Sequence, residues 1–413
     1  MSVRLFLALD NCFASKRWCS VSEWMRVVKD LGVDRVEASA DNEIDPLYTT
    51  AAYRADWLRA VRREGERTGV QVVNLYSGHG TYATLGLAHH DPRVRHHLAS
   101  RWMAPMLRLA GQLEAGLGCF AHAFSEDVLA DPRRQRATER ILFDSLKELS
   151  AVAERSGATA FSIEQMRSPH QPPWTLAGTA DFLRKTNRKV AGLPVYLTID
   201  TGHQSGQRGF RAPSAAEITT FMRDLRQGRT SSLYLGTAIH YQRIADLVHA
   251  GASMAEVTAQ VAALVDAAPY LFSATGDDDP YRWLHEFAPY APIIHLQQTD
   301  NTSSSHRHFT AAHNRTGVIH AEQVVAAITE SYQRPRPAGF PPRVDTIHLT
   351  LEPFLDTAGH PRLMLEELAE SVSYWRRVIP HEGLLIADRT TGAHSDRAGS
   401  RLPKRSMTRV RAT

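Results

Sequence analysis

Cysteine is scarce in this sequence, which has only 3 cysteines, Cys12, Cys19 and Cys119, among its 413 residues. Three cysteines cannot form the disulfide framework that holds many small secreted proteins together. This scarcity indicates a reducing compartment, and we therefore expect a cytoplasmic protein.

Long hydrophobic runs are also missing. The apolar stretch within residues 1–10 is too short for a signal peptide and ends in an aspartate. No later stretch approaches the roughly 20 apolar residues that a membrane-spanning helix needs. These observations argue against secretion and against membrane insertion, so we expect no membrane partner.

A strong excess of one charge is absent from most of the chain. The formal net charge is +4, but residues 389–413 contain seven basic residues and one acidic residue, which leaves the remainder with a net charge of −2. Nucleic-acid-binding proteins hold phosphates with a basic face, so we expect no nucleic-acid partner. The segment 388–413 is polar and lacks apolar periodicity, which predicts a disordered basic tail.

A regular alternation of short apolar runs with helical patterns of ten residues or more fills the rest of the chain, residues 1–387. Short apolar runs between turn residues are typical of buried parallel strands, and their alternation with helices indicates a parallel α/β sheet. Eight such units predict a closed (β/α)8 TIM barrel. The expected strands lie at 5–9, 35–36, 70–75, 119–121, 159–163, 195–199, 292–294 and 346–351.

One βα unit is too long for this pattern. Asp200 and His295, at the ends of the sixth and seventh strands, lie 95 positions apart, whereas a barrel repeat needs about 30 residues or slightly more. We therefore predict an insertion at about 207–278 on the catalytic face, either a lid or an oligomer contact. The acidic run 277–279 within this unit is interpreted as a solvated loop and helix N-cap.

Four consecutive strands are each followed by a residue that can bind a metal. Glu164, Asp200, His295 and Glu352 end the fifth to eighth strands, and His203 follows Asp200 by three positions. Barrel enzymes carry their active sites at this end of their strands. Three carboxylates and one imidazole suit Mn²⁺, Mg²⁺, Co²⁺ or Zn²⁺. The alternative for each acidic residue alone is a helix N-cap or a solvated loop residue.

Two of these carboxylates suggest proton-transfer chemistry. A divalent ion can bind a hydroxyketone, make the neighbouring C–H more acidic and stabilise the resulting enediolate. If Glu164 removes a proton from one face and Glu352 returns one to the other face, the carbon is epimerised. Return to the neighbouring carbon would give aldose–ketose isomerisation, and loss of a hydroxyl would give a dehydrating lyase.

The order Glu, Asp-x-x-His, His, Glu resembles the xylose-isomerase-like (AP endonuclease family 2) TIM-barrel superfamily over roughly residues 3–380. That superfamily includes ketose 3-epimerases, sugar-phosphate isomerases, inosose dehydratases and type IV AP endonucleases. The segments 9–18, 36–41 and 76–89 are similar to the erythritol-pathway tetrulose-phosphate racemases, also called erythrulose-1-phosphate 3-epimerases. AP endonucleases use a larger set of zinc ligands and a basic groove, which this chain does not show.

The resemblance implies a homo-oligomeric, metal-dependent epimerase of a small ketose phosphate, with manganese as the first choice of ion. Glu164 and Glu352 would be ligands and the acid/base pair, and Asp200 and His295 would be ligands only. An isomerase or an inosose-dehydratase-like lyase is the alternative. The implied substrate contacts are His203 and Arg307, with Lys16, Arg17, His79 and His122 as further candidates for a phosphate or hydroxyl contact.

Two further histidines, His306 and His308, flank Arg307. They could add ligands to the metal site. We interpret them instead as part of a solvated histidine-rich loop.

Overall fold

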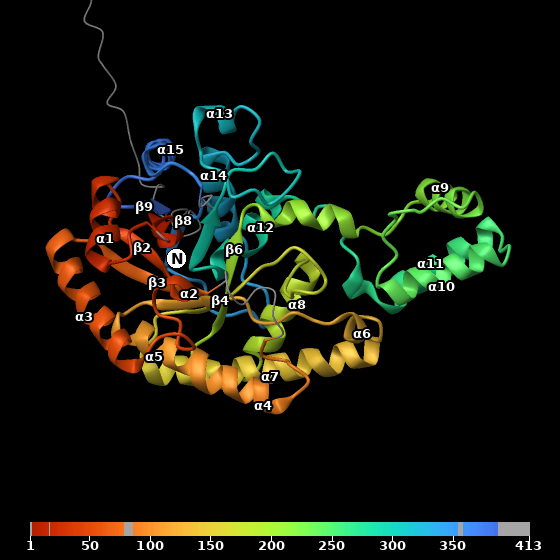
Figure 1. The fold of residues 1–413 in the computed structure, drawn as a ribbon, viewed down its shortest axis with the longest axis horizontal. Helices are drawn as coiled ribbons and strands as arrows, with labels where there is room; N and C mark the ends of the chain where they lie inside the picture. Colours follow the sequence, from red (N-terminus) through yellow and green to blue (C-terminus); the bar gives the residue numbers. More distant parts are fainter. Residues whose placement is uncertain (1, 16, 78–85, 354–357, 387–413) are drawn as a thin grey trace, which may run out of the picture.

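The computed structural model describes residues 2–15, 17–77, 86–353 and 358–386. Eight parallel strands form a closed ring, in which β1 pairs with both β8 and β2 (Figure 1). The predicted (β/α)8 barrel is therefore confirmed. The strands are β1 Val3–Asp10, β2 Arg35–Ser39, β3 Gln71–Ser77, β4 Gly116–Cys119, β5 Phe161–Glu164, β6 Val195–Asp200, β7 Ile293–Leu296 and β8 Thr346–Leu351.

Helices surround this ring on its outside (Figure 1). The longer ones are α1 Val21–Asp30, α3 Ala51–Thr68, α5 Ala104–Gln112, α7 Pro132–Ser156, α8 Leu176–Asn187, α12 Pro280–Phe287, α14 Ala321–Gln333 and α15 Pro361–Arg376. Short α-helices are α2 Ala40–Glu43, α4 Pro92–His97, α6 Glu126–Leu129 and α13 Ala311–Asn314. Segments of 3-10 helix occur at Asn11–Ala14, His203–Phe210, Pro269–Leu271 and Ala288–Tyr290.

Local sequence explains several helix ends. Ser20 and Glu23 form the predicted capping box at the start of α1, in which each side chain bonds a backbone amide of the first turn. At the end of α7, Gly157 adopts φ +75°, a conformation that a residue without a side chain reaches at little cost. Between the helices and the ring, the side chains of Trp24, Trp283 and Trp375 are fully buried. Burial of an aromatic or aliphatic side chain of this kind stabilises the fold by about 1.5–3 kcal/mol.

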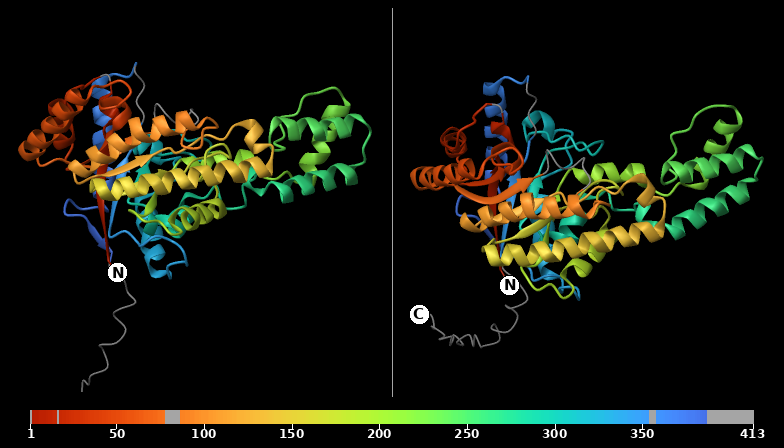
Figure 2. Two further views of the ribbon diagram at one scale, coloured as in Figure 1. Left: turned by 90° about the horizontal axis from the view of Figure 1, so that it is seen from below. Right: turned by 60° about the horizontal axis from the view of Figure 1, so that its bottom comes forward.

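Three helices between β6 and β7 leave the barrel. They are α9 Ala215–Arg226, α10 Ala238–His249 and α11 Met254–Ala267, and Figure 2 shows them projecting sideways as an arm. The arm has a hydrophobic cluster of its own, which includes Ile218, Phe221 and Val257. The arm lies within the range 207–278, and the proposal that this range is an insertion with a functional role stays a prediction.

Three differences from the expected elements go beyond a shift of strand bounds or bear on the site. β4 ends at Cys119 and not at residue 121, so His122 lies beyond the strand. The helix expected near residues 91–115 is divided by a π-helix at Leu98–Met103. A ninth strand, β9 Leu384–Ile386, pairs antiparallel with β1; three residues are too few to show a period.

No helix in the described part of the chain is both long enough and apolar enough to cross a lipid bilayer. The tail predicted at 388–413 lies outside the described residues.

Candidate active site and metal centre

The barrel brings the four predicted ligands together at the carboxyl ends of its strands. Glu164 and Asp200 are the last residues of β5 and β6, His295 lies in β7, and Glu352 directly follows β8. Asp200 and His295 are paired across the two neighbouring strands. Each residue offers one ligand atom, and these four atoms lie within 4.8 Å of one another.

The geometry of this cluster fits a divalent cation. Nδ1 of His295 lies 3.0 Å from Oε1 of Glu164 and 3.3 Å from Oε2 of Glu352. Oε2 of Glu352 is buried and has no hydrogen-bond partner among the described residues. Three carboxylates buried at one point repel each other unless positive charge lies between them. The donor set is the one expected for Mn²⁺, Mg²⁺, Co²⁺ or Zn²⁺.

The electrostatics of the cluster point the same way. Burial, together with the charges of Asp200 and Glu164, raises the pKa of the Glu352 carboxyl well above its usual range. Burial disfavours a charge on His295, but the charges of Glu352 and Glu37 outweigh it and hold the pKa of the imidazole well above its usual value. The site therefore retains protons in place of a cation, and a cation would release them.

Sequence reasoning missed three residues that support the cluster from β2 and β3. Oε2 of Glu37 lies 2.9 Å from Nε2 of His295, and Nδ2 of Asn74 donates to the other carboxylate oxygen of Glu37 over 2.6 Å. The hydroxyl of Tyr76 donates to Oε2 of Glu164. A signal for Glu37 was present, because it also follows an expected strand, but β2 was expected to be very short.

Two glycines in β4 make room for these side chains. A Cβ atom on Gly116 would lie 2.5 Å from Oδ1 of Asn74, and one on Gly118 would lie 3.1 Å from the ring of Tyr76. Because these two positions of β4 have no side chain, the polar side chains of the neighbouring strand fit into the barrel interior.

His203 lies beside the cluster. Its Nδ1 is 2.8 Å from the carbonyl of Gln165, so this nitrogen carries the proton and donates it. Its Nε2 is 3.9 Å from Oδ2 of Asp200. Asp200, His203 and His306 form a second group whose ligand atoms lie within 4.8 Å of one another.

The interpretation of His306 and His308 as members of a solvated loop is wrong. Both side chains are buried, because the loop after β7 folds back and pairs Arg307 with Gln298. His306 has φ +44°, which is unusual for a residue with a side chain. Its backbone N–H donates to Oε1 of Gln297 over 2.6 Å, and its Nδ1 lies 3.1 Å from the carbonyl of Glu352.

The structure does not bring the other predicted substrate contacts into the cluster. Arg307 forms an ion pair with Asp300 over 3.1 Å at a partly exposed position. Nδ1 of His122 accepts hydrogen bonds from the backbone amides of Gly86 and Ala88 over 3.0 and 3.3 Å. Burial lowers the pKa of His122 to about 3. The side chain is therefore neutral and accepts the hydrogen bonds of these two backbone amides.

The remaining candidates are Arg17, Lys16 and His79. Arg17 donates to the carbonyl of Gly359 over 3.2 Å. Lys16 and His79 lie outside the described residues. The roles assigned to all these residues from the sequence stay predictions.

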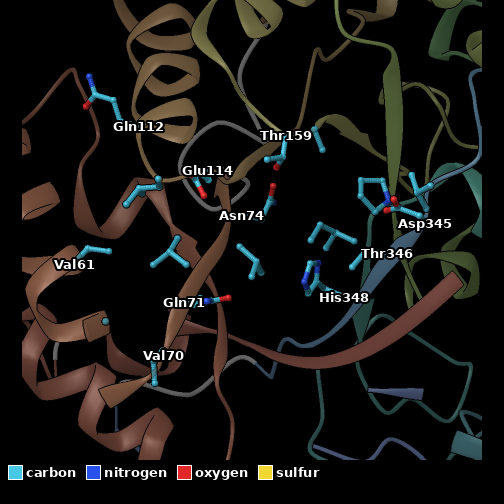
Figure 3. Close-up of a pocket in the computed structure, with 18 of the residues that line it drawn as sticks. Val61, Val70, Gln71, Asn74, Gln112, Glu114, Thr159, Asp345, Thr346 and His348 are labelled. Atoms are coloured by element: carbon cyan, nitrogen blue, oxygen red, sulfur yellow. The ribbon is translucent and has the colours of Figure 1, made fainter. Parts of the chain in front are cut away.

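A separate cavity lies on the floor of the barrel, at the amino ends of the strands (Figure 3). It has a volume of about 900 Å³, and its lining includes Asn74, Thr346 and His348. Its position opposite the buried carboxylates excludes it as the metal centre. Asn74 lines this floor cavity and also donates to Glu37, which in turn contacts His295.

The family model described as "Xylose isomerase-like TIM barrel" matches residues 25–331. The chain is 35% identical to D-erythrulose 1-phosphate 3-epimerase of Brucella abortus (strain 2308) over 105 residues, which are 25% of this chain and 30% of that relative. The match thus spans less than a third of the length of the curated relative.

Solved structures with the same fold cover nearly the whole chain. A xylose-isomerase-type protein of Rhodospirillum rubrum matches with a TM-score of 0.64 and 16% identity, over 91% of this chain and 100% of that one. L-ribulose 3-epimerase matches with a TM-score of 0.50 and 14% identity, over 91% and 92% of the two chains. At these identities the matches show the fold alone.

Proposed function

Because this chain belongs to the xylose isomerase-like TIM barrel family, we propose that it is a metal-dependent sugar epimerase that acts on a small ketose phosphate of the tetrulose type. The observation that carries the proposal is the buried group of Glu164, Asp200, His295 and Glu352. Two members of this group are carboxylates from strands separated by two others in the ring, as an epimerase that uses two bases requires.

The four residues would hold a divalent ion, with manganese as the first choice. Such an ion supplies Lewis acidity, which makes the C–H next to a substrate carbonyl more acidic. Glu164 and Glu352 are the groups placed to exchange the proton of that carbon. One removes it to leave the enediolate of the substrate, and the other returns a proton to the opposite face.

His203 has a defined part in this scheme. Since its Nδ1–H is held by the carbonyl of Gln165, its Nε2 is an acceptor beside Asp200. It can accept a hydrogen bond from a substrate hydroxyl and so fix the orientation of the reacting carbon. Arg307, Arg17, Lys16 and His79 remain the proposed contacts for the phosphate.

The tetrulose phosphate is supported by the partial match to D-erythrulose 1-phosphate 3-epimerase. A cytoplasmic location and a homo-oligomeric assembly are part of the same proposal. The location is supported by the three cysteines, all of which are free thiols.

Proton exchange in deuterated water tests the reaction. Protein reloaded with Mn²⁺ is incubated with individual ketose phosphates, the ion is then removed, and the products are examined by proton NMR. We expect loss of the signal of the carbon-bound proton and appearance of the 3-epimer. An aldose product would identify an isomerase, and loss of water would identify a lyase. Absence of exchange with any ketose phosphate, at one bound ion per chain, would overturn the proposal.

The variant Glu352→Gln links the reaction to the site. Glutamine keeps an oxygen ligand and a similar volume but cannot accept the proton. Net turnover should fall by a factor of about 10² to 10⁴, while Glu164 still exchanges the proton of one epimer with solvent. The matched variant Glu164→Gln should show the opposite preference between the epimers. Metal content is measured in both, because a lost ion would imitate a lost base.

A further inference from the structure

Glu37 is a buried carboxylate that the reaction described above does not use. It lies in β2, and its side chain is fully buried. β2 supplies none of the four residues of the metal-binding group. Glu37 nevertheless reaches across the barrel, because its Oε2 lies 2.9 Å from Nε2 of His295.

The two nitrogens of His295 face different surroundings. Nδ1 faces Glu164 and Glu352 at 3.0 and 3.3 Å, within the ligand group. Nε2 faces only Glu37 among the partners found in the described residues. A neutral imidazole has one N–H and one lone pair, and a carboxylate can only accept a hydrogen bond. Both nitrogens face carboxylates, so a cation in the ligand group decides between them: it would take the lone pair of Nδ1, and the one N–H of the neutral ring then lies on Nε2, where Glu37 accepts it.

Glu37 is itself held in place. Nδ2 of Asn74 donates to its Oε1 over 2.6 Å, and Asn74 can occupy this position because residue 116 has no side chain. Both carboxylate oxygens of Glu37 are thus engaged, one by a fixed donor and one by His295. The ring of Tyr76 packs edge-on against His295, with centroids 4.8 Å apart and planes at 90°, and restricts its rotation further.

We propose that Glu37 is a positioning residue of the metal centre, which fixes the tautomer and orientation of His295 so that Nδ1 is the ligand atom. This inference rests on the metal centre of the proposed function. A carboxylate that accepts the second N–H of a ligating histidine raises the basicity of that ligand, and its loss typically weakens metal affinity by about 10- to 100-fold.

Mn²⁺ affinity of the full-length protein tests the inference without any substrate. Metal-free wild type, Glu37→Ala and Glu37→Gln are titrated with Mn²⁺ by calorimetry. We expect Glu37→Ala to bind about 10- to 100-fold more weakly. Glu37→Gln retains an oxygen that can accept from Nε2, so its loss should be smaller.

Glu43→Ala is the matched control. Glu43 is also a carboxylate at the carboxyl end of the barrel, and its Oε2 accepts from Nε1 of Trp57 over 2.8 Å, but it is not part of the metal-binding groups. Its loss should lower the melting temperature of the metal-free protein and leave Mn²⁺ affinity unchanged.

The Co²⁺-loaded protein gives a spectroscopic reading of the tautomer. A histidine bound through Nδ1 shows its Nε2–H as a paramagnetically shifted proton signal that exchanges with deuterated water. This exchange should be slow in the wild type and much faster in Glu37→Ala, because the acceptor of the N–H is gone. A general loosening of the fold would not select this one proton.

Two results would overturn the inference alone: Mn²⁺ affinity of Glu37→Ala within about a factor of two of the wild type, or an equal loss in Glu43→Ala. A wild-type protein that binds no divalent ion would overturn the proposed function, and the inference with it. The two failures are therefore distinguishable.

Discussion

Gln297 decides how many ions the site can hold. Its side-chain amide donates to both oxygens of Asp200, over 2.7 and 2.9 Å, and lies 3.2 Å from Nε2 of His306. This amide is oriented by the backbone N–H of His306, which donates to its oxygen. It therefore fills the space between Asp200 and His306 that a second cation would need.

We accordingly expect one Mn²⁺ per chain, although two groups of potential ligands share Asp200. Replacing the amide by a carboxylate in Gln297→Glu exchanges a donor for a ligand and should raise the capacity toward two ions. Equilibrium dialysis followed by metal analysis measures both values. Two ions in the wild type would show that Gln297 does not exclude the second one.

Asp10 makes the stability of the metal-free protein depend on pH. Burial, aided by the negative charge of Glu37, raises its pKa from 3.8 to about 7. The folded state then keeps a proton that the unfolded state loses, so stability falls as the pH rises from about 4 to about 7 and stays low above that window. The free-energy penalty is about 4 kcal/mol at most.

Asp10→Asn should remove this penalty, because asparagine has no charge to bury. The free energy of unfolding of the metal-free variant should exceed that of the wild type at pH 8 and match it near pH 4. Urea titrations at both pH values measure the difference. A gain of equal size at both values would assign the effect to packing and not to charge.

At the scale of elements, β4 shows what local sequence cannot reveal. Its residues Gly116–Cys119 include two glycines, which weaken the sequence signal for a strand. The sequence therefore predicts the strand at the apolar residues 119–121. The glycines are there for Asn74 and Tyr76, which come from β3. The two glycines are therefore explained by tertiary packing against β3, which the sequence of β4 alone does not reveal.

The site residues likewise differ in whether the local sequence could reveal them. Glu164, Asp200, His295 and Glu352 could be found from the sequence, because each stands at the end of an apolar run and the barrel geometry then brings them together. His306 could not be found in this way. Its burial depends on a loop that folds back onto the barrel and on a left-handed backbone conformation, neither of which has a periodic signal.

Gly116→Ala tests the role of the space in β4. The added Cβ would lie 2.5 Å from Oδ1 of Asn74 and 3.1 Å from Cβ of Ala160, so side chains must shift at a cost of about 1–3 kcal/mol. Chemical denaturation should show this loss, and calorimetry should show weaker Mn²⁺ binding, because Asn74 holds Glu37. Gly209→Ala is the control: its Cβ would meet nothing within 4 Å, and its effect should stay within about 0.5 kcal/mol.

At the scale of the whole molecule, the arm and the barrel are two hydrophobic units in one chain. Val257 is fully buried in the arm cluster, and Leu264 packs against both clusters. Val257→Asp places a charge in the small core of the arm, which a cluster of that size cannot accommodate. Limited proteolysis should then cleave within 215–267, while Mn²⁺ binding and the melting of the barrel persist. Loss of Mn²⁺ binding would show instead that the arm holds the catalytic face in shape.

The floor cavity offers an inhibitor a second way to act on the metal centre, apart from the catalytic mouth. Asn74 lines that cavity and holds the carboxylate that orients His295. A small molecule seated there and hydrogen-bonded to Asn74 would compete with Glu37 for the same donor. It would weaken the binding of the ion without occupying the substrate site, so raising the substrate concentration would not relieve the inhibition. Compounds selected against the catalytic mouth alone would never sample this route.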